Sequence, residues 1–378
     1  MEFYKKISII VLVLVCITLL FAISLIPWDR GTVSINDTTE GGISGTIANA
    51  SVEDTILLDS GNYTGENNTG ITISKSITLK GNGPRDTVII DAKNLTRIFT
   101  IENNLVVTFT NITFINTNAT GNGGAINNPH GNTRMRFINC TFINSELSNT
   151  SDFDGLGGAI YNVGLDMSLI DCTFTNISTV ANGGAIYNIG IGVDLLECNF
   201  TNIIANGSGG AIHNIGFGIG LTDCNFTNII ANGSGGAIHN IGFGIGLVDC
   251  SFTDILANGS GGAIYNTGIG IDLLECIFTN ISADGNGGAI HNRGIGINLV
   301  NCNFTDIFAE GNGGAIENIG IGINLVSCIF TNILANGNGG AIYNDGVNVN
   351  SVDSIFTNIN ANGDGNTISG GSSKIMVG

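Results

Sequence analysis

The sequence predicts an all-β protein whose chain winds as a three-sided parallel β-helix, one coil for every 26 residues. Three observations indicate this fold class: a tetrapeptide that returns at a fixed interval, three short strand-like runs in each interval, and columns of identical residues in register. A period of this size is typical of repeats that bury their apolar faces only by stacking. The tetrapeptide is Gly-Gly-Ala-Ile, and its regular copies begin at Gly157, Gly183, Gly209, Gly235, Gly261, Gly287, Gly313 and Gly339.

The first 30 residues form a targeting or membrane segment. Lys5 and Lys6 precede an apolar run over residues 7–27, which is about long enough to span a bilayer. A cleaved signal peptide and a retained signal anchor both fit this run, and either one places the remainder outside the membrane. The predicted location is therefore extracellular or at the cell surface, with membrane contact only through this segment.

The chain after this segment divides into four parts. Residues 31–47 are rich in Gly, Thr and Ser and are expected to be a linker. Residues 48–122 contain irregular β-branched runs, and we expect them to form an N-terminal cap with the first coils. Residues 123–363 carry the regular repeats, beginning with an early tetrapeptide at Gly123, and residues 364–378 form a C-terminal tail.

Each regular repeat contains three apolar runs. In the copy that begins at Gly235 they cover residues 237–240, 245–250 and 252–256. Gly and Asn border each run, and these residues tolerate the left-handed backbone that sharp corners require. Three short strands per repeat predict three sheets, in which each strand pairs with its equivalent about 4.8 Å away in the next coil.

One Cys and one Phe recur two residues apart in each coil, which places both side chains on the same face of a strand. We expect that face to point inward. The Cys column should be a row of buried free thiols, because in-register strands hold neighbouring β-carbons farther apart than a disulfide prefers. Nothing in the sequence indicates a metal site or a cofactor, since no CxxC pair occurs. The eight cysteines of this column are Cys140, Cys172, Cys198, Cys224, Cys250, Cys276, Cys302 and Cys328.

A third column follows the Phe by two residues and contains Asn or Asp. We expect it to form a corner at which stacked amides hydrogen bond along the axis. Its members are Asn144, Asn176, Asn202, Asn228, Asp254, Asn280, Asp306, Asn332 and Asn358.

The residue after each Ala-Ile varies in charge and shape, so we expect it to face solvent. Aromatic rings and imidazoles along a rigid face could bind sugars or an extended partner, although such residues also simply decorate exposed strands. We take this column as the candidate ligand-facing surface. It comprises Tyr161, Tyr187, His213, His239, Tyr265, His291, Glu317 and Tyr343.

The charge balance limits the classes of partner. The formal net charge is −18, and Arg293 is the only Lys or Arg between residues 137 and 373. A nucleic-acid surface needs clustered Lys and Arg to displace counterions, so nucleic acid is excluded as a partner. Asn206, Asn232 and Asn258 each precede Gly-Ser in an expected corner and are candidate glycosylation sites.

The sequence offers little for catalysis. Enzymes that cleave sugars use a unique cluster of carboxylates, often with a basic partner. Here acidic residues such as Asp171, Asp223 and Asp249 recur at repeat positions, and basic partners are nearly absent. One irregular loop, over residues 145–156, carries Asp152 and Asp154 and could bind a ligand.

The segment Asp171-Cys-Thr-Phe-Thr-Asn176, followed by Gly183-Gly-Ala-Ile-Tyr-Asn188, resembles repeats of adhesin-like surface proteins of methanogenic archaea. It is similar, more distantly, to repeats of chlamydial polymorphic outer-membrane proteins, although Ile177 occupies the fourth position of the chlamydial FxxN pattern, so that match is partial. The likeness covers about residues 53–362. It implies a right-handed β-helix, export from the cell and an adhesive role.

The residues and this resemblance together favour a cell-surface or secreted adhesin-like protein that binds cells or glycans without catalysis. Two alternatives remain. A β-helical polysaccharide lyase or glycoside hydrolase predicts a non-repeating acidic cluster in a groove. A passive surface spacer or coat protein predicts no ligand at all.

Overall fold

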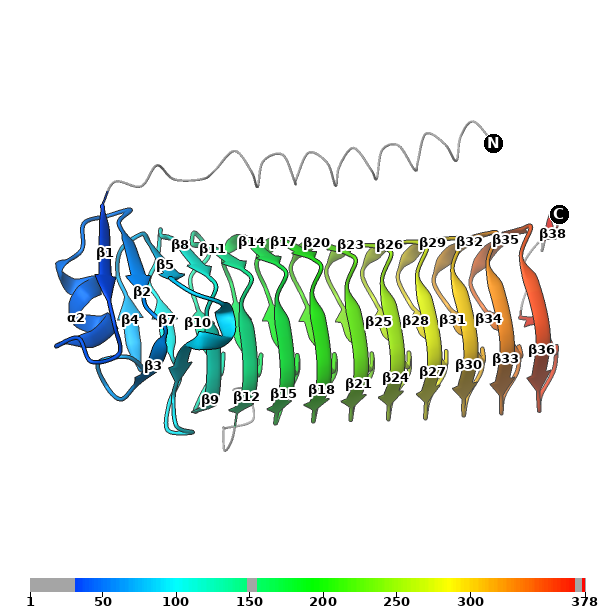
Figure 1. Ribbon diagram of the computed structural model, residues 1–378. Coiled ribbons are helices and arrows are strands. Elements are labelled where there is room, and N and C mark those ends of the chain that lie inside the picture. The colour runs from blue at the N-terminus through cyan, green and yellow to red at the C-terminus, as the bar shows by residue number, and fades with distance from the viewer. Residues whose placement is uncertain (1–30, 148–154, 371–375, 378) are drawn as a thin grey trace.

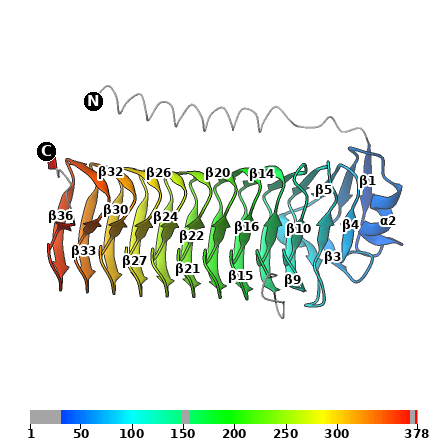
Figure 2. The same ribbon diagram turned by 180° about the vertical axis from the view of Figure 1, so that it is seen from behind.

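The protein forms an elongated β-solenoid, described by a computed structural model for residues 31–147, 155–370 and 376–377 (Figures 1 and 2). It is a right-handed parallel β-helix of about 13 coils with three strands in each coil, which confirms the predicted fold class. The segment 1–30, with its predicted signal or anchor, lies outside the described residues, and so do Asp152 and Asp154. No helix in the described part of the chain is long and apolar enough to cross a membrane.

Three parallel sheets form the three sides of the solenoid. Sheet A contains β1 (Thr32–Ile35), β2 (Thr55–Leu58), β5 (Ile77–Gly81), β8 (Val106–Thr110), β11 (Arg134–Ile138), β14 (Leu165–Ile170), β17 (Ile191–Leu196), β20 (Phe217–Thr222), β23 (Phe243–Val248), β26 (Ile269–Leu274), β29 (Ile295–Val300), β32 (Ile321–Val326), β35 (Val347–Val352) and β38 (Met376–Val377). Sheet B contains β3 (Gly61–Thr64), β6 (Val88–Asp91), β9 (Thr113–Ala119), β12 (Thr141–Leu147), β15 (Thr173–Thr179), β18 (Asn199–Ala205), β21 (Asn225–Ala231), β24 (Ser251–Ala257), β27 (Ile277–Ala283), β30 (Asn303–Ala309), β33 (Ile329–Ala335) and β36 (Ile355–Ala361). Sheet C contains β4 (Ile71–Ile73), β7 (Phe99–Ile101), β10 (Ile126–Asn128), β13 (Ile160–Asn162), β16 (Ile186–Asn188), β19 (Ile212–Asn214), β22 (Ile238–Asn240), β25 (Ile264–Asn266), β28 (Ile290–Asn292), β31 (Ile316–Asn318), β34 (Ile342–Asn344) and β37 (Ile368–Ser369).

The strands pair in register from one coil to the next. Phe226 in β21, for example, lies opposite Phe252 in β24, exactly one repeat later along the chain. Because equivalent positions of successive coils lie opposite one another, each recurring position of the sequence becomes a straight column along the solenoid axis.

The N-terminal end is closed by strand β1 and helix α2 (Gly42–Asn49), which Figure 1 shows at the blue end of the rod. Residues 31–47, expected to be a linker, therefore belong to this cap. Ile43 and Ile47 lie one helical turn apart, and both are buried against the first coils. The side-chain oxygen of Asn68 accepts a hydrogen bond from the Ile43 amide and fixes the start of the helix. In the sequence, the Gly, Thr and Ser residues around these two isoleucines make the short apolar face hard to recognise.

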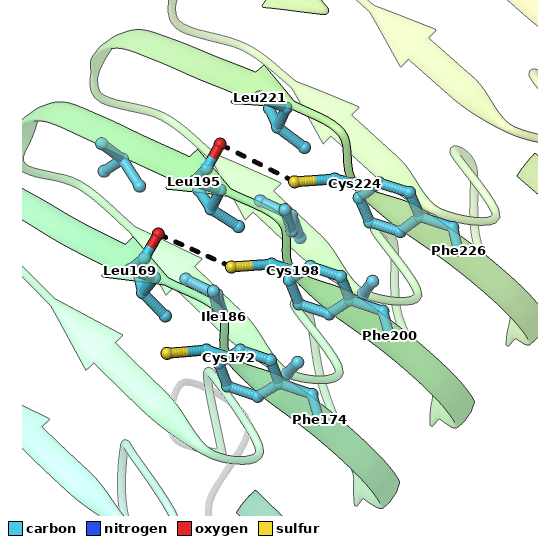
Figure 3. Close-up of a cluster of buried hydrophobic side chains, with 14 of the residues drawn as sticks. Leu169, Cys172, Phe174, Ile186, Leu195, Cys198, Phe200, Leu221, Cys224 and Phe226 are labelled. Carbon is cyan, nitrogen blue, oxygen red and sulfur yellow. Dashed lines mark hydrogen bonds between the residues drawn. The ribbon is translucent and has the colours of Figure 1, made fainter. Parts of the chain in front are cut away.

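The Cys and Phe columns lie in the core, as predicted (Figure 3). Phe200 and Phe226 stack with their ring centroids 4.8 Å apart, and the same spacing continues along the column. Each thiol points at backbone oxygens; Cys224 donates to the carbonyl of Leu195 at 3.7 Å and to that of Thr222 at 3.3 Å. The eight cysteines of the column are free and buried, and burial raises the pKa of the Cys140 and Cys198 thiols.

A ladder of asparagines inside sheet C was not predicted from the sequence. The side-chain amide of Asn188 donates to the side-chain oxygen of Asn214 at 2.8 Å, and Asn214 donates in the same way to Asn240. These side chains are buried, so the ladder satisfies polar groups that would otherwise be costly inside the core. The ladder is formed by Asn128, Asn162, Asn188, Asn214, Asn240, Asn266, Asn292, Asn318 and Asn344.

The repeated Gly-Gly pair allows the loop before each sheet C strand to pack tightly. Gly209 has φ +69°, and a β-carbon on Gly210 would lie 1.9 Å from the carbonyl oxygen of Gly236 in the next coil. No other residue fits the second position without displacing the backbone. The constant tetrapeptide is therefore a packing requirement of the fold.

Candidate functional site

The column that the sequence placed in solvent is largely buried in the structure. His213 is only 3% exposed, and Tyr187, His291 and Glu317 are buried to a similar degree. The expectation of exposure is therefore wrong for these four side chains, and the other four are half-buried. A role of this column in ligand binding stays a prediction. The whole column is Tyr161, Tyr187, His213, His239, Tyr265, His291, Glu317 and Tyr343.

The glycine loop that precedes each sheet C strand causes this burial. The carbonyl oxygen of Ser208 lies 3.4 Å from Nδ1 of His213, and a β-carbon on Gly209 would lie 3.1 Å from the His213 Cα. The rings also cover one another, since Tyr187 and His213 stack with centroids 4.9 Å apart. Burial lowers the pKa of His213 to about 4 and that of His239 to about 3, so both imidazoles are neutral at pH 7.

One buried acid interrupts this column of rings. Nδ1 of His291 lies 2.5 Å from Oε2 of Glu317, and both side chains are 4% exposed. The contact is close but is not aligned as a hydrogen bond, and Nε2 of His291 has no hydrogen-bond partner among the described residues. The pair is unique within the repeat array, but its burial leaves it out of reach of a substrate.

The outer face of sheet B carries an exposed polar strip. Asn202 donates to the side-chain oxygen of Asn176 at 3.1 Å, and Asn228 donates to that of Asn202 at 2.7 Å. The predicted amide ladder is thereby confirmed, although it lies on an exposed bend within the strands. Asn202 has φ +56° and Asn228 +54°, a backbone that Asn adopts more readily than most residues. Beside the ladder runs a column of half-buried threonines, Thr175, Thr201, Thr227, Thr253, Thr279, Thr305 and Thr331.

Carboxylates line the corner between sheets A and B. Five exposed acidic side chains follow one another in successive coils, before the column continues with Asn301 and Ser327. Partial burial, followed by the charges of Glu275 and Asp223, raises the pKa of Asp249. Paired carboxyl groups are the arrangement used in acid–base cleavage of glycosidic bonds. The five acids are Asp171, Glu197, Asp223, Asp249 and Glu275.

The candidate glycosylation sites lie on the turn that follows sheet B. Asn206, Asn232 and Asn258 are exposed, and Asn232 donates to the side-chain oxygen of Asn206 at 3.1 Å. Modification of these residues stays a prediction. No group of three or more His, Cys, Asp or Glu residues within the described ranges is arranged to hold a metal ion.

The family comparison matches short repeats and not the whole chain. The Chlamydia polymorphic membrane protein repeat matches residues 171–189, 249–267, 275–293 and 327–345. These matches support the resemblance to chlamydial repeats and a parallel β-helix repeat protein, while the likeness to archaeal adhesins stays a prediction. No curated protein matches the chain.

Several solved structures share the fold. A mannuronic acid specific family 6 polysaccharide lyase from human gut microbiota is 10% identical, with a TM-score of 0.47 over 86% of this chain and 87% of its own. A family 6 lyase from Pseudopedobacter saltans is 12% identical, with a TM-score of 0.47 over 91% and 92%. Tailspike protein 3 of bacteriophage CBA120 is 11% identical, with a TM-score of 0.47 over 89% of this chain and 56% of its own.

These neighbours correct one expectation. The sequence led us to expect no enzymatic activity, but the solved structures that share the fold are mainly polysaccharide lyases and epimerases, which contradicts that expectation. Their identities to this chain are so low that the likeness concerns the fold alone. The activity of this chain must therefore be argued from its own surface.

Proposed function

We propose that this protein is exported and recognises a neutral, hydroxyl-rich polysaccharide along the polar strip of sheet B. The observation that carries the proposal is the exposed ladder of sheet B, in which most coils present an asparagine amide and two coils present the carboxylates of Asp254 and Asp306. The match to a repeat of chlamydial membrane proteins supports a surface-related location.

The ladder keeps part of its hydrogen-bonding capacity for a ligand. An asparagine amide has two N–H donors and an oxygen with two lone pairs. Asn202 uses one donor toward Asn176 and one lone pair toward Asn228, so one donor and one lone pair remain for an outside partner. The hydroxyl of Thr201 lies beside them on the same face. Repeated in most coils, this set suits a chain of hydroxyl groups that extends along the axis.

Charge favours a neutral glycan over an acidic one. The strip adjoins the column of five carboxylates, and Arg293 is the only Lys or Arg between residues 137 and 373. A polymer of uronic acids would meet like charge without a basic partner, which opposes association. Neutral sugars avoid this repulsion and can donate their hydroxyls to the carboxylates.

Hydrolysis of the bound glycan is a second candidate function, favoured by the raised pKa of Asp249. A carboxyl group of raised pKa is suited to donate a proton to a leaving oxygen, and Glu275 is the carboxyl group of the adjacent coil that could act with it. Register places the two in adjacent coils, because Val248 and Leu274 just before them are paired.

The proposal is tested by incubating the full chain with neutral, amino and uronate polysaccharides and measuring both retention and chain length. Thr201→Val, Thr227→Val and Thr253→Val together should weaken retention of a neutral glycan by at least about tenfold, through loss of three hydroxyls. Thr222→Val is the control, because this threonine belongs to sheet A and lies outside the polar strip. No retention of any glycan, or equal loss in both variants, would contradict recognition by sheet B.

The same incubation tests hydrolysis. If Asp249 and Glu275 cleave the glycan, Asp249→Asn and Glu275→Gln should each abolish shortening of the polymer while retention persists. Asp353→Asn is the control, since it changes an exposed acid of the same column three coils beyond Glu275. If the unaltered protein retains the glycan without shortening it, hydrolysis is excluded and recognition is supported.

A further inference from the structure

Sheet A carries an exposed apolar ridge that the proposed glycan strip does not use. The first residues of seven successive sheet A strands are apolar and between 44% and 54% exposed. In the turn just before these strands, four further isoleucines are 36% to 45% exposed. The ridge consists of Ile191, Phe217, Phe243, Ile269, Ile295, Ile321 and Val347, together with Ile189, Ile215, Ile241 and Ile319.

The ridge exposes more apolar surface than is usual for a soluble monomer. Taking about 180 Å² for a full side chain, the exposed fractions correspond to roughly 900 Å² of apolar surface. The largest apolar patch on a typical soluble monomer is about 300–600 Å². One partner in a standard protein interface contributes about 800 Å², so the ridge matches one half of such an interface.

The continuous column of acidic side chains lies away from this ridge, whereas Asp194 and Asp272 lie on the same strands, three residues beyond Ile191 and Ile269. The carboxylate corner lies at the opposite end of the sheet A strands, six residues and roughly 20 Å from the ridge. Among the turn residues that precede the seven strands, Arg293 and Asp345 are the charged ones, Thr267 is polar, and the other four are isoleucines. Arg293 is exposed and forms no ion pair within the part of the chain that the structure describes.

We propose that the ridge binds a second copy of this chain, antiparallel, about a two-fold axis through the row of Thr267 and Ile269. The seven rows then overlap completely, and Ile269 meets Ile269 of the partner subunit. The row of Ile319 and Ile321 meets the row that holds Ile215 and Phe217 in the other copy. This axis buries the whole ridge in one isologous contact.

The same axis gives Arg293 a partner of suitable chemistry. The row of Arg293 lies one step from the axis, so it faces the row of Ile241 and Phe243 in the other copy. Phe243 stacks on Phe217 with centroids 4.8 Å apart and planes parallel, so the two rings turn their edges to the partner and the apolar stem of Arg293 can pack against them. Arg293 of one copy therefore lies against the row of Phe243 in the other copy, with Phe217 in the next row.

The axis makes a specific prediction for cysteine trapping in the full chain. Ile269→Cys should form a disulfide between two copies, because the residue lies on the axis and meets itself. Ile191→Cys should not trap with itself but should trap with Val347→Cys, since their rows exchange across the axis. Thr279→Cys on sheet B is the control for random collision. Trapping of Thr279→Cys as fast as Ile269→Cys would overturn the proposal.

A charge exchange tests the same interface without crosslinking. Light scattering should show a dimer of the unaltered chain, and Ile269→Glu should raise its dissociation constant at least about 100-fold by placing two carboxylates together. Ile269→Lys should do the same, and mixing the two variants should restore dimers. A folded monomer of the unaltered chain, or association unaffected by both variants, would overturn the proposal. Ridge-dependent capture of lipid vesicles or of glycan by a monomer would assign the ridge another partner and also overturn it.

Discussion

The polar column of sheet C is buried, whereas the apolar ridge of sheet A, a few residues later in each coil, is exposed. In one coil, His213 follows Ala-Ile on sheet C and is buried, whereas Phe217, four residues later on sheet A, is 52% exposed. A glycine loop lies against the sheet C strand, while nothing among the described residues covers the start of the sheet A strand. In this solenoid, the packing of the neighbouring loop therefore determines the exposure of a side chain more than the polarity of that side chain does.

The largest expected effect concerns the buried pair in the sheet C column. Glu317→Ala removes the acid that contacts His291 in a site that water does not reach, and we expect a loss of at least about 3 kcal/mol in the free energy of unfolding. Urea unfolding followed by circular dichroism measures the change. Glu310→Ala is the control because Glu310 is exposed. A loss of equal size for this variant would contradict the expected difference between a buried and an exposed acid.

The second effect concerns pH. Burial lowers the pKa of His213 from 6.5 to about 4, so the unfolded chain binds the proton more tightly than the folded protein does. Stability from this group is therefore complete above about pH 6.5 and is lost as the pH falls toward 4, by about 3 kcal/mol. Thermal unfolding between pH 7 and 4 should show a shallower decline for His213→Leu. His130→Leu, which changes an exposed histidine, should leave the profile unaltered.

The smallest effect compares the two columns within a single coil. Tyr265 is half-buried and stacks on His291 with centroids 4.8 Å apart, so Tyr265→Ser should cost about 2 kcal/mol. Ile269→Ser, four residues later on the ridge, should cost less than about 0.5 kcal/mol in a monomer. Unfolding is measured at a protein concentration low enough to dissociate any dimer. Equal costs would show that the ridge is packed as firmly as the sheet C column.

Much of the fold could be predicted because each structural position of the coil recurs in many repeats of the sequence. The spacing of Cys140 and Phe142, and of their equivalents, placed both columns inside, and the structure confirms this. The amide ladder through Asn202 and Asn228 was also predicted. An N-terminal cap was expected over residues 48–122, but helix α2 was not, because it rests on Ile43 and Ile47 within a segment whose other residues resemble a linker.

The functional surface was harder to predict for the same reason. The sequence singled out the varied column through His213 because variation usually indicates solvent, but here a loop covers it. The ridge was missed although its signal is present, since Ile191, Phe217 and Ile269 occupy one apolar position of the repeat. Its alternation with Ile219 and Leu221 made it look like another inward-facing position.

The sequence by itself determined the solenoid, its period, its three strands per coil and its inward Cys and Phe columns. These features follow from local spacing, and in-register stacking carries each position straight to its equivalent in the next coil. Only the tertiary structure decided which outward columns meet solvent, how the chain closes its N-terminal end, and that Glu317 lies beside His291. Those outcomes depend on where loops and neighbouring side chains pack in space, and the order of residues within one repeat does not specify that.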